Sequence, residues 1–223
     1  MNTLRLVGTE VSALGAAALS LPLRLVVSRE SFDPVAPHRT PVVLVHGFFG
    51  DPTNFLLLRS YLATSGIRNF TTFAYPPRID YQRLAARLGR EITSLCLATG
   101  ATEVDIVGHS LGGLVGRYLV EMWPEMPVRR LVTLGAPYFA SPLPAQELSV
   151  FAAHDPFIPL PHPVYGPHAA HVAGGGGVAV IPDCGHWGLL YHRAVLQEVT
   201  RFLRIPEAAV GLAAPPLALD VAS

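Results

Sequence analysis

The sequence contains few charged residues. Asp, Glu, Lys and Arg make up 14% of its 223 residues, against about 25% in an ordinary soluble domain. The formal net charge is zero and the chain has no basic run, which argues against binding to nucleic acid. The mean hydropathy is high, at +0.38. Together these features indicate an apolar surface that meets a membrane or an apolar ligand.

Cysteine is also scarce. The chain has two cysteines, Cys96 and Cys184, which are too few for a disulfide framework. We expect both thiols to be unpaired. The sequence has no Cys-x-x-Cys motif and no cysteine/histidine cluster. It therefore predicts neither a metal site nor a cofactor.

A long uninterrupted apolar run is missing from the N-terminal region. Val11–Val27 is apolar but is interrupted by a proline and an arginine, and a transmembrane helix needs about 20 apolar residues. Arg5 is the single positive residue before this segment, and Glu10 is unfavourable in a signal peptide, although an Ala-x-Ser pattern fits a cleavage site. Two alternatives stay open for residues 1–40. One is export or peripheral membrane contact. The other is an extra helix or strand packed on the domain of a cytoplasmic protein, and we slightly favour it.

The length predicts one domain, which we place at residues 41–205, between the extension 1–40 and a Pro/Ala-rich tail of residues 206–223. Within it, short apolar runs alternate with segments of helical spacing. Uniformly apolar strands that alternate with helices indicate an α/β fold with a mostly parallel sheet of about six strands, covered on both faces. The expected strands are Val42–Val45, Phe70–Tyr75, Val104–Val107, Leu131–Leu134, Leu148–Ala153 and Val178–Ile181; the expected helices are Tyr81–Thr99, a segment from Leu111, and Leu189–Leu203.

One motif carries chemistry. Residues 108–112 read Gly-His-Ser-Leu-Gly, a G-x-S-x-G pattern between the strand-like "VDIV" and an amphipathic helix. This is the context of a nucleophile elbow, in which a sharp turn raises the serine above the sheet and side chains two positions away would clash. The helix N-terminus brings unpaired N–H groups beside the serine. Ser110 is therefore the predicted nucleophile.

A serine nucleophile needs a base, and the chain has nine histidines. We favour His186, because it follows the last expected strand in "DCGHWGLLY" and lies at the edge where parallel sheets hold their sites. His109, inside the elbow, is expected to point away from the chemistry, and His46 is expected to brace the loop after the first strand. Three others are expected to lie on a Pro/Gly-rich surface loop: His162, His168 and His171.

The base needs an orienting acid. Asp155 follows the strand-like "LSVFAA" at the same edge and gives the chain order serine, aspartate, histidine. Asp183 is the alternative, but it lies three residues before His186 and would have to fold back along its own loop. Asp51 and Asp80 precede the serine and suit loop or helix-cap roles.

The negative oxygen that forms during serine attack needs hydrogen-bond donors. "HGFFG", residues 46–50, follows the first core strand, where a donor loop belongs. We expect the backbone N–H groups of Phe48 and Leu111 to form the oxyanion hole.

These motifs resemble those of the α/β-hydrolase superfamily. "PVVLVHGFFGDPTNF", "VDIVGHSLGGLVGRY", "LVTLGAP" and "GHWGLLY" are similar, in the same order, to motifs of the small bacterial triacylglycerol lipases that lack a lid. The resemblance spans about Pro41 to Leu203. It implies the α/β-hydrolase fold, with the six strands as the family's third to eighth, and a serine hydrolase of lipid-like or small esters. The sequence departs from that group in its N-terminal extension and in a long Pro/Gly-rich loop between Asp155 and His186.

The segment that carries a helical lid in large lipases is short here. Gly135–Glu147 has thirteen residues, three of them proline, and such a segment disfavours a lid helix. We therefore expect an open apolar cleft, with Phe49, Tyr138 and Phe139 as rim residues beside Phe48. Phospholipase, inositol deacylase, thioesterase and acyltransferase activities use the same triad and remain alternatives. A binding module without activity is disfavoured, because all the required residue types are present.

Overall fold

The computed structural model describes residues 7–8, 10–15, 30–77, 80–137, 146–160 and 177–204. In this part of the chain a six-stranded sheet has the order β2-β1-β3-β4-β5-β6, and each neighbouring pair of strands is parallel. The predicted α/β fold with a parallel sheet is confirmed. The strands are β1 (Val42–Val45), β2 (Phe70–Phe73), β3 (Val104–His109), β4 (Val128–Leu134), β5 (Glu147–Ala152) and β6 (Gly177–Ile181).

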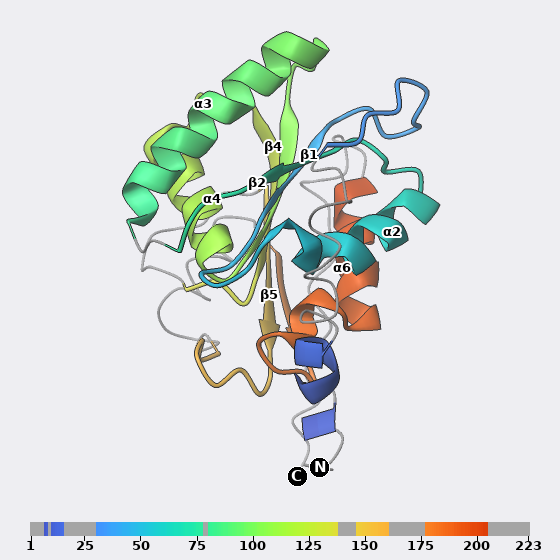
Figure 1. Ribbon diagram of the computed structural model, residues 1–223, viewed down its shortest axis with the longest axis vertical. Helices are drawn as coiled ribbons and strands as arrows, with labels where there is room; N and C mark the ends of the chain where they lie inside the picture. Colours follow the sequence, from blue (N-terminus) through green and yellow to red (C-terminus); the bar gives the residue numbers. More distant parts are fainter. Residues whose placement is uncertain are drawn as a thin grey trace.

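Helices cover both faces of the sheet. Figure 1 shows α3 and α4 on one side of the strands and α2 and α6 on the other. Successive side chains of β1 point to opposite faces of the sheet. Val42 and Leu44 pack on the α2/α6 side, and Val43 and Val45 pack on the α3/α4 side. The helices are α2 (Leu56–Thr64), α3 (Tyr81–Thr99), α4 (Leu111–Met122) and α6 (Arg193–Arg204), with short 3₁₀ turns η2 (Pro52–Phe55) and η3 (Gly188–Leu190).

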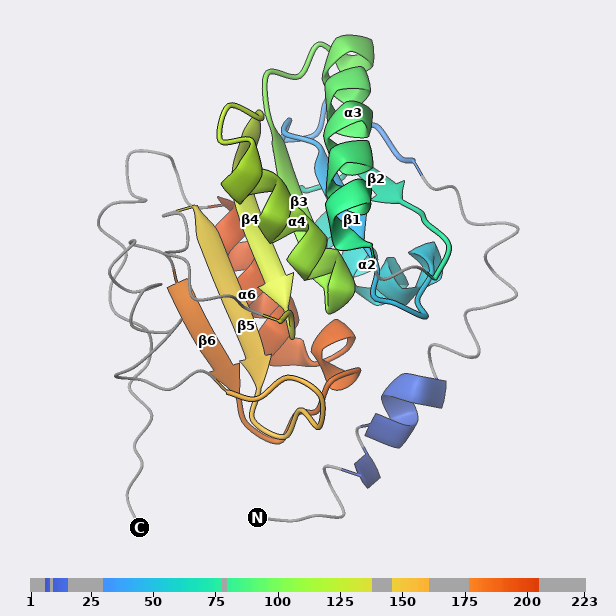
Figure 2. The ribbon, with the colours of Figure 1, turned by 90° about the vertical axis from the view of Figure 1, so that its left-hand side faces the viewer.

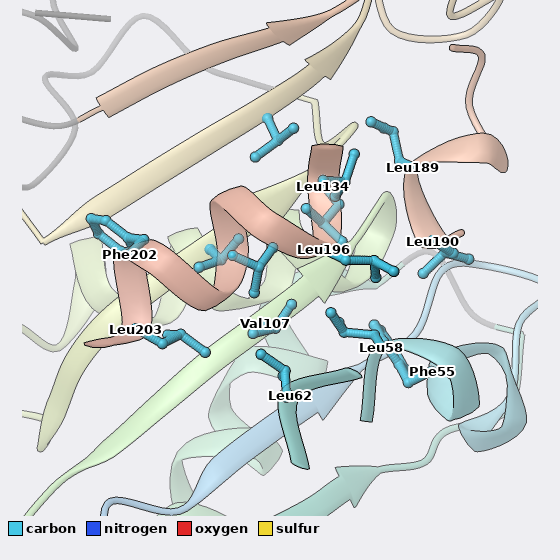
Figure 3. Packing of buried hydrophobic residues seen from close by; sticks show 14 of the residues in the cluster. Phe55, Leu58, Leu62, Val107, Leu134, Leu189, Leu190, Leu196, Phe202 and Leu203 are labelled. Carbon is cyan, nitrogen blue, oxygen red and sulfur yellow. The ribbon is translucent and has the colours of Figure 1, made fainter. Parts of the chain in front are cut away.

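The core between the sheet and α6 fixes the last segment of the fold. Figure 3 shows Leu196 of α6 packed among Leu134 of β4, Val107 of β3 and Leu58 of α2. These four side chains are almost completely buried. Burial of each such side chain contributes about 1.5–3 kcal/mol relative to exposure.

The prediction of one helix over Leu189–Leu203 is wrong. The 3₁₀ turn η3 ends at Leu190, and α6 begins only at Arg193. The break follows from local hydrogen bonds: the N–H of Ala194 donates to Nδ1 of His192 at 3.3 Å, so this side chain caps a new helix start. Helix α2 was not predicted at all. By contrast, Asp80 caps α3 by accepting from the N–H of Arg83 at 3.1 Å, as expected.

Because every strand is parallel, the loops after β1, β3, β4, β5 and β6 meet at one edge. The helical residues 7–8 and 10–15 lie at this same edge in both ribbon views (Figures 1 and 2). Further along, Ser31 pairs with Phe70 at the start of β2. Among the residues that the structure describes, no helix has the length and apolar character to span a membrane.

Candidate active site

The turn between β3 and α4 has the geometry that the G-x-S-x-G motif predicts. Ser110 has φ 52° and ψ −121°, a conformation that costs a non-glycine residue about 1–3 kcal/mol. A Cβ atom on Gly108 would lie 2.5 Å from the carbonyl oxygen of Gly112, and one on Gly112 would lie 2.1 Å from that of Val45. No side chain fits at either position. The two glycines are therefore required by the close packing of the turn against itself and against β1.

The loop after β1 runs directly past Ser110. A Cβ atom on Gly47 would lie 3.2 Å from Cβ of Ser110. His46 braces this loop, as predicted: its Nδ1 lies 2.8 Å from the carbonyl oxygen of Gly47, and its Nε2 lies 3.3 Å from the backbone nitrogen of Tyr75. Since a carbonyl only accepts and an N–H only donates, these contacts place the proton of His46 on Nδ1.

The expected oxyanion donors lie on either side of this close approach. Phe48 belongs to the loop after β1, and Leu111 is the first residue of α4, where N–H groups have no partner within the helix. Phe48 is half-buried against the α3/α4 core. Phe49, an expected rim residue, is 88% exposed, and its ring packs edge-on at 4.3 Å from that of Phe48.

Two other expected rim residues, Tyr138 and Phe139, lie outside the described residues, as does most of the segment considered for a lid. The same holds for residues 161–176 of the Pro/Gly-rich loop, including its three histidines.

At the edge formed by the carboxyl ends of the strands, the side chain of His186 contacts that of Asp155. Nδ1 of His186 lies 2.7 Å from Oδ2 of Asp155, and the two side chains are only 6% and 1% exposed. The other carboxylate oxygen, Oδ1, accepts the N–H groups of Phe157 at 2.8 Å and Ile158 at 2.9 Å. Asp183, the alternative acid, is exposed in the turn after β6. Because a carboxylate accepts, Nδ1 of His186 holds the proton and Nε2 keeps its lone pair.

The surroundings of Asp155 keep it ionised. Burial raises the pKa of this carboxyl, but hydrogen bonds from the His186 side chain and from the N–H groups of Ile158 and Phe157 outweigh burial. The pKa of Asp155 is therefore lowered below its usual value. A charged Asp155 favours the Nδ1–H tautomer of His186, which is the form a general base requires.

The prediction that His109 points away from the chemistry is wrong. Its Nε2 lies 3.1 Å from the carbonyl oxygen of His186, and the two imidazole rings are 4.8 Å apart. His109 also lies near Gly47: a Cβ atom there would be 3.1 Å from its Nδ1. His109 therefore lies close to the loop that passes Ser110 and contacts the loop that carries His186.

Three further residues lie at this edge that the sequence analysis did not predict as site residues. Gly135 follows β4, and a Cβ atom there would lie 3.2 Å from Oδ2 of Asp155 and 3.3 Å from Nδ1 of His186. Phe157 packs edge-on against the His186 ring at 5.2 Å and is 59% exposed. Glu10 contacts the loop that carries His186. The "LGAP" motif marks the glycine in the sequence, but no local pattern identifies the other two.

The remaining titratable groups in the described part of the chain do not form a metal site. No group of three or more His, Cys, Asp or Glu side chains there is arranged to hold a metal ion. Cys96 and Cys184 are free, as predicted. Burial, followed by the negative charges of Glu10 and Asp155, raises the pKa of Cys184 to about 12, so this thiol is unsuited to act as a nucleophile.

Two curated proteins are similar to this chain in sequence over part of their length. A triacylglycerol lipase of Burkholderia plantarii is 30% identical over 147 residues, which are 56% of this chain and 37% of that protein. A triacylglycerol lipase of Pseudarthrobacter phenanthrenivorans is 32% identical over 130 residues, or 49% of this chain and 36% of the relative. The chain thus matches little more than a third of the length of these curated relatives.

The fold is shared more widely than the sequence. The structure of lipase B from Aspergillus fumigatus superposes with a TM-score of 0.59 at 15% identity, and the match covers 82% of this chain and 59% of that one. The model of the alpha/beta hydrolase family matches residues 42–171, which is more than half of the 223 residues. The chain therefore belongs to the alpha/beta hydrolase family.

Proposed function

We propose that the protein is a serine carboxylic-ester hydrolase, a lipase or esterase, that cleaves lipid-like esters through an acyl-enzyme intermediate. The observation that carries the proposal is the 2.7 Å hydrogen bond between His186 and Asp155. It lies at the sheet edge where the strained turn at Ser110 opens α4. A serine at such a turn and an acid-oriented histidine are the two parts that acyl transfer to serine needs.

Each residue has a defined role in the proposed reaction. Nε2 of His186 takes the proton of Ser110 as its Oγ attacks the ester carbonyl carbon. Asp155 holds the imidazole in the Nδ1–H tautomer and stabilises the imidazolium that forms. His186 then gives the proton to the leaving alcohol. In the second half of the reaction, His186 activates a water molecule that hydrolyses the acyl-enzyme and restores the free serine.

The backbone supplies the electrostatic part of catalysis. In the proposed oxyanion hole, the N–H groups of Phe48 and Leu111 donate to the carbonyl oxygen as it becomes negative. Removal of one such donor in a comparable site costs about 3–4 kcal/mol of transition-state stabilisation. The brace of His46 against Gly47 and Tyr75 supports this role, because it holds the first donor loop before substrate arrives.

Two features support an apolar ester as the substrate. Phe49 and Phe157, at 88% and 59% exposure, place aromatic surface at the catalytic edge. The two curated relatives are named triacylglycerol lipases. We propose a lipid or small ester as the partner, with peripheral contact to the lipid surface that holds it.

A substrate panel tests the proposal. We expect the purified protein to hydrolyse p-nitrophenyl esters from acetyl to palmitoyl, and a triglyceride emulsion, with Ser110→Ala inactive on each. Parallel assays with a phospholipid, an acyl-phosphatidylinositol, an acyl-thioester and an alcohol acceptor distinguish the alternative activities on the same residues. Hydrolysis of the thioester or phospholipid at a clearly higher kcat/KM than every carboxylic ester would contradict the proposed substrate class.

A further inference from the structure

The loop that carries His186 is held by a residue from the far end of the chain. The carboxylate of Glu10 accepts three backbone N–H groups: those of Gly185 at 3.1 Å and Gly188 at 2.9 Å on Oε1, and that of Trp187 at 3.2 Å on Oε2. These contacts bridge 175 to 178 residues of sequence. Three N–H groups that converge on one anion form a backbone nest.

The loop is shaped to receive this carboxylate. A Cβ atom on Gly185 would lie 2.5 Å from Cδ of Glu10, and one on Gly188 would lie 2.6 Å from Oε1. Either side chain would expel the carboxylate. The two glycines that flank His186 and Trp187 in "GHWG" thus leave room for Glu10, which gives them a role beyond chain flexibility.

The carboxylate controls the backbone on both sides of the histidine. Glu10 fixes the N–H groups of Gly185 and Trp187, before and after His186. The carbonyl oxygen of His186 itself lies 3.1 Å from Nε2 of His109. The direction of the His186 side chain from this backbone determines whether Nδ1 meets Asp155, which it does at 2.7 Å. Without Glu10, three N–H groups would lose their acceptor and the loop would have alternative conformations.

We propose that Glu10 is a positioning residue for His186. It acts through the Gly185–Gly188 backbone and aligns the imidazole with Asp155 and with Ser110. The inference rests on the proposed function for its catalytic consequence. The structural part of the inference, that the His186–Asp155 hydrogen bond depends on Glu10, does not depend on which substrate the protein hydrolyses.

The test uses the full-length protein and three variants. Glu10→Ala removes the carboxylate, and Glu10→Gln keeps the shape but presents an NH₂ group to N–H donors. Asp183→Asn is the matched control, because it removes an exposed carboxylate near the same loop. We expect both Glu10 variants to lower kcat by about 10- to 100-fold, as a small misplacement of a reacting group does, with KM changed less than about threefold. The control should retain the kcat of the unmodified protein.

Two readouts separate positioning from a general loss of structure. The low-field proton resonance of His186 Nδ1–H should be present in the unmodified protein and in Asp183→Asn, and weakened or shifted in both Glu10 variants. Formate or acetate should enter the vacated nest of Glu10→Ala and restore kcat, whereas chloride at equal ionic strength should not. Glu10→Gln should not be rescued, because its amide still fills the nest.

Several results would overturn the inference. Unchanged kcat and an unchanged Nδ1–H resonance in both Glu10 variants would show that the loop is set without the carboxylate. Loss of activity in Glu10→Ala without rescue by formate, together with a retained resonance, would also contradict it. The resonance needs no ester, so an altered resonance in a protein that hydrolyses no ester would refute the proposed function and leave the role of Glu10 intact.

Discussion

Nε2 of His109 lies 3.1 Å from the carbonyl oxygen of His186, across 77 residues of sequence. A carbonyl only accepts, so Nε2 of His109 carries a proton. Burial, followed by repulsion from His186, lowers the pKa of His109 to about 3, so Nδ1 is unprotonated and the ring is neutral near pH 7. The residue directly before the elbow serine thus also holds the backbone of the loop that carries the proposed base.

This neutral His109 predicts how stability depends on pH. In the unfolded chain its pKa returns to about 6.5, so the unfolded state binds more protons between about pH 6.5 and about pH 3. The free energy of unfolding should therefore fall as the pH is lowered through this window, by up to about 1.4 kcal/mol per unit from this group. His109→Gln keeps an N–H donor but does not titrate. Urea unfolding from neutral to acid pH should show a smaller loss for the variant; equal losses would contradict a neutral buried His109.

The two candidate acids should differ sharply in their effect on catalysis. Asp155→Asn should lower kcat by about 10⁴-fold, the loss seen where the wrong histidine tautomer forms in a well-studied triad. Asp183→Asn removes the same charge from an exposed turn, and kcat should change less than about twofold. Steady-state kinetics on one soluble ester measure both. If the larger loss belonged to Asp183, the assignment of the 2.7 Å contact to catalysis would be wrong.

Alanine at Gly135, with alanine at Gly100 as its control, tests whether a side chain fits beside the His186–Asp155 contact. Both have positive φ, 55° and 72°, so alanine at either position costs about 1–2 kcal/mol of backbone strain. A Cβ atom at Gly100 meets nothing within 4 Å, whereas one at Gly135 lies 2.7 Å from Cδ1 of Leu189 and close to both partners of the contact. Gly135→Ala should therefore lower kcat by about tenfold or more, and it should lose more stability than Gly100→Ala, because its Cβ atom also crowds the buried Leu189. Equal kcat in the two variants would refute this crowding.

The short Gly135–Glu147 segment predicts a site without a lid. The rate of tributyrin hydrolysis should then rise smoothly as the substrate concentration passes its solubility limit, since an open cleft accepts monomeric esters. Soluble short-chain esters should also be turned over. A steep rise at the point where the emulsion forms would indicate a cover over the cleft, and the lidless prediction would be wrong.

The sequence predicted the parallel sheet and the sharp turn at Ser110 because both depend on local patterns. Apolar strand runs and the G-x-S-x-G motif are short and contiguous, and the same clash that forbids a side chain at Gly108 and Gly112 explains why the motif marks the turn. The start of α6 was missed because its cap is the ring nitrogen of His192. Histidine is not among the usual N-cap residues.

The contacts around His186 could not be read from the sequence for a different reason. Glu10 binds backbone N–H groups, which every residue except proline possesses, so no side-chain pattern reveals its partner. In the sequence it counted only as an unfavourable residue for a signal peptide. His109 was misjudged because its role as a donor depends on the path of a loop 77 residues away. The Glu10 contact arises only when the helical residues 10–15 meet the loop after β6, and the His109 contact only when β3 meets that same loop.

Covalent labelling tests the central proposal most directly. A fluorophosphonate probe reacts with a serine that has an active base beside it, so it reports on Ser110, His186 and Asp155 together without a choice of ester. Intact-mass and peptide mass spectrometry should find a single adduct on Ser110, with labelling abolished in Ser110→Ala and strongly slowed in Asp155→Asn. Labelling that persists in a folded Ser110→Ala variant, or a folded wild-type protein that does not react, would contradict the account.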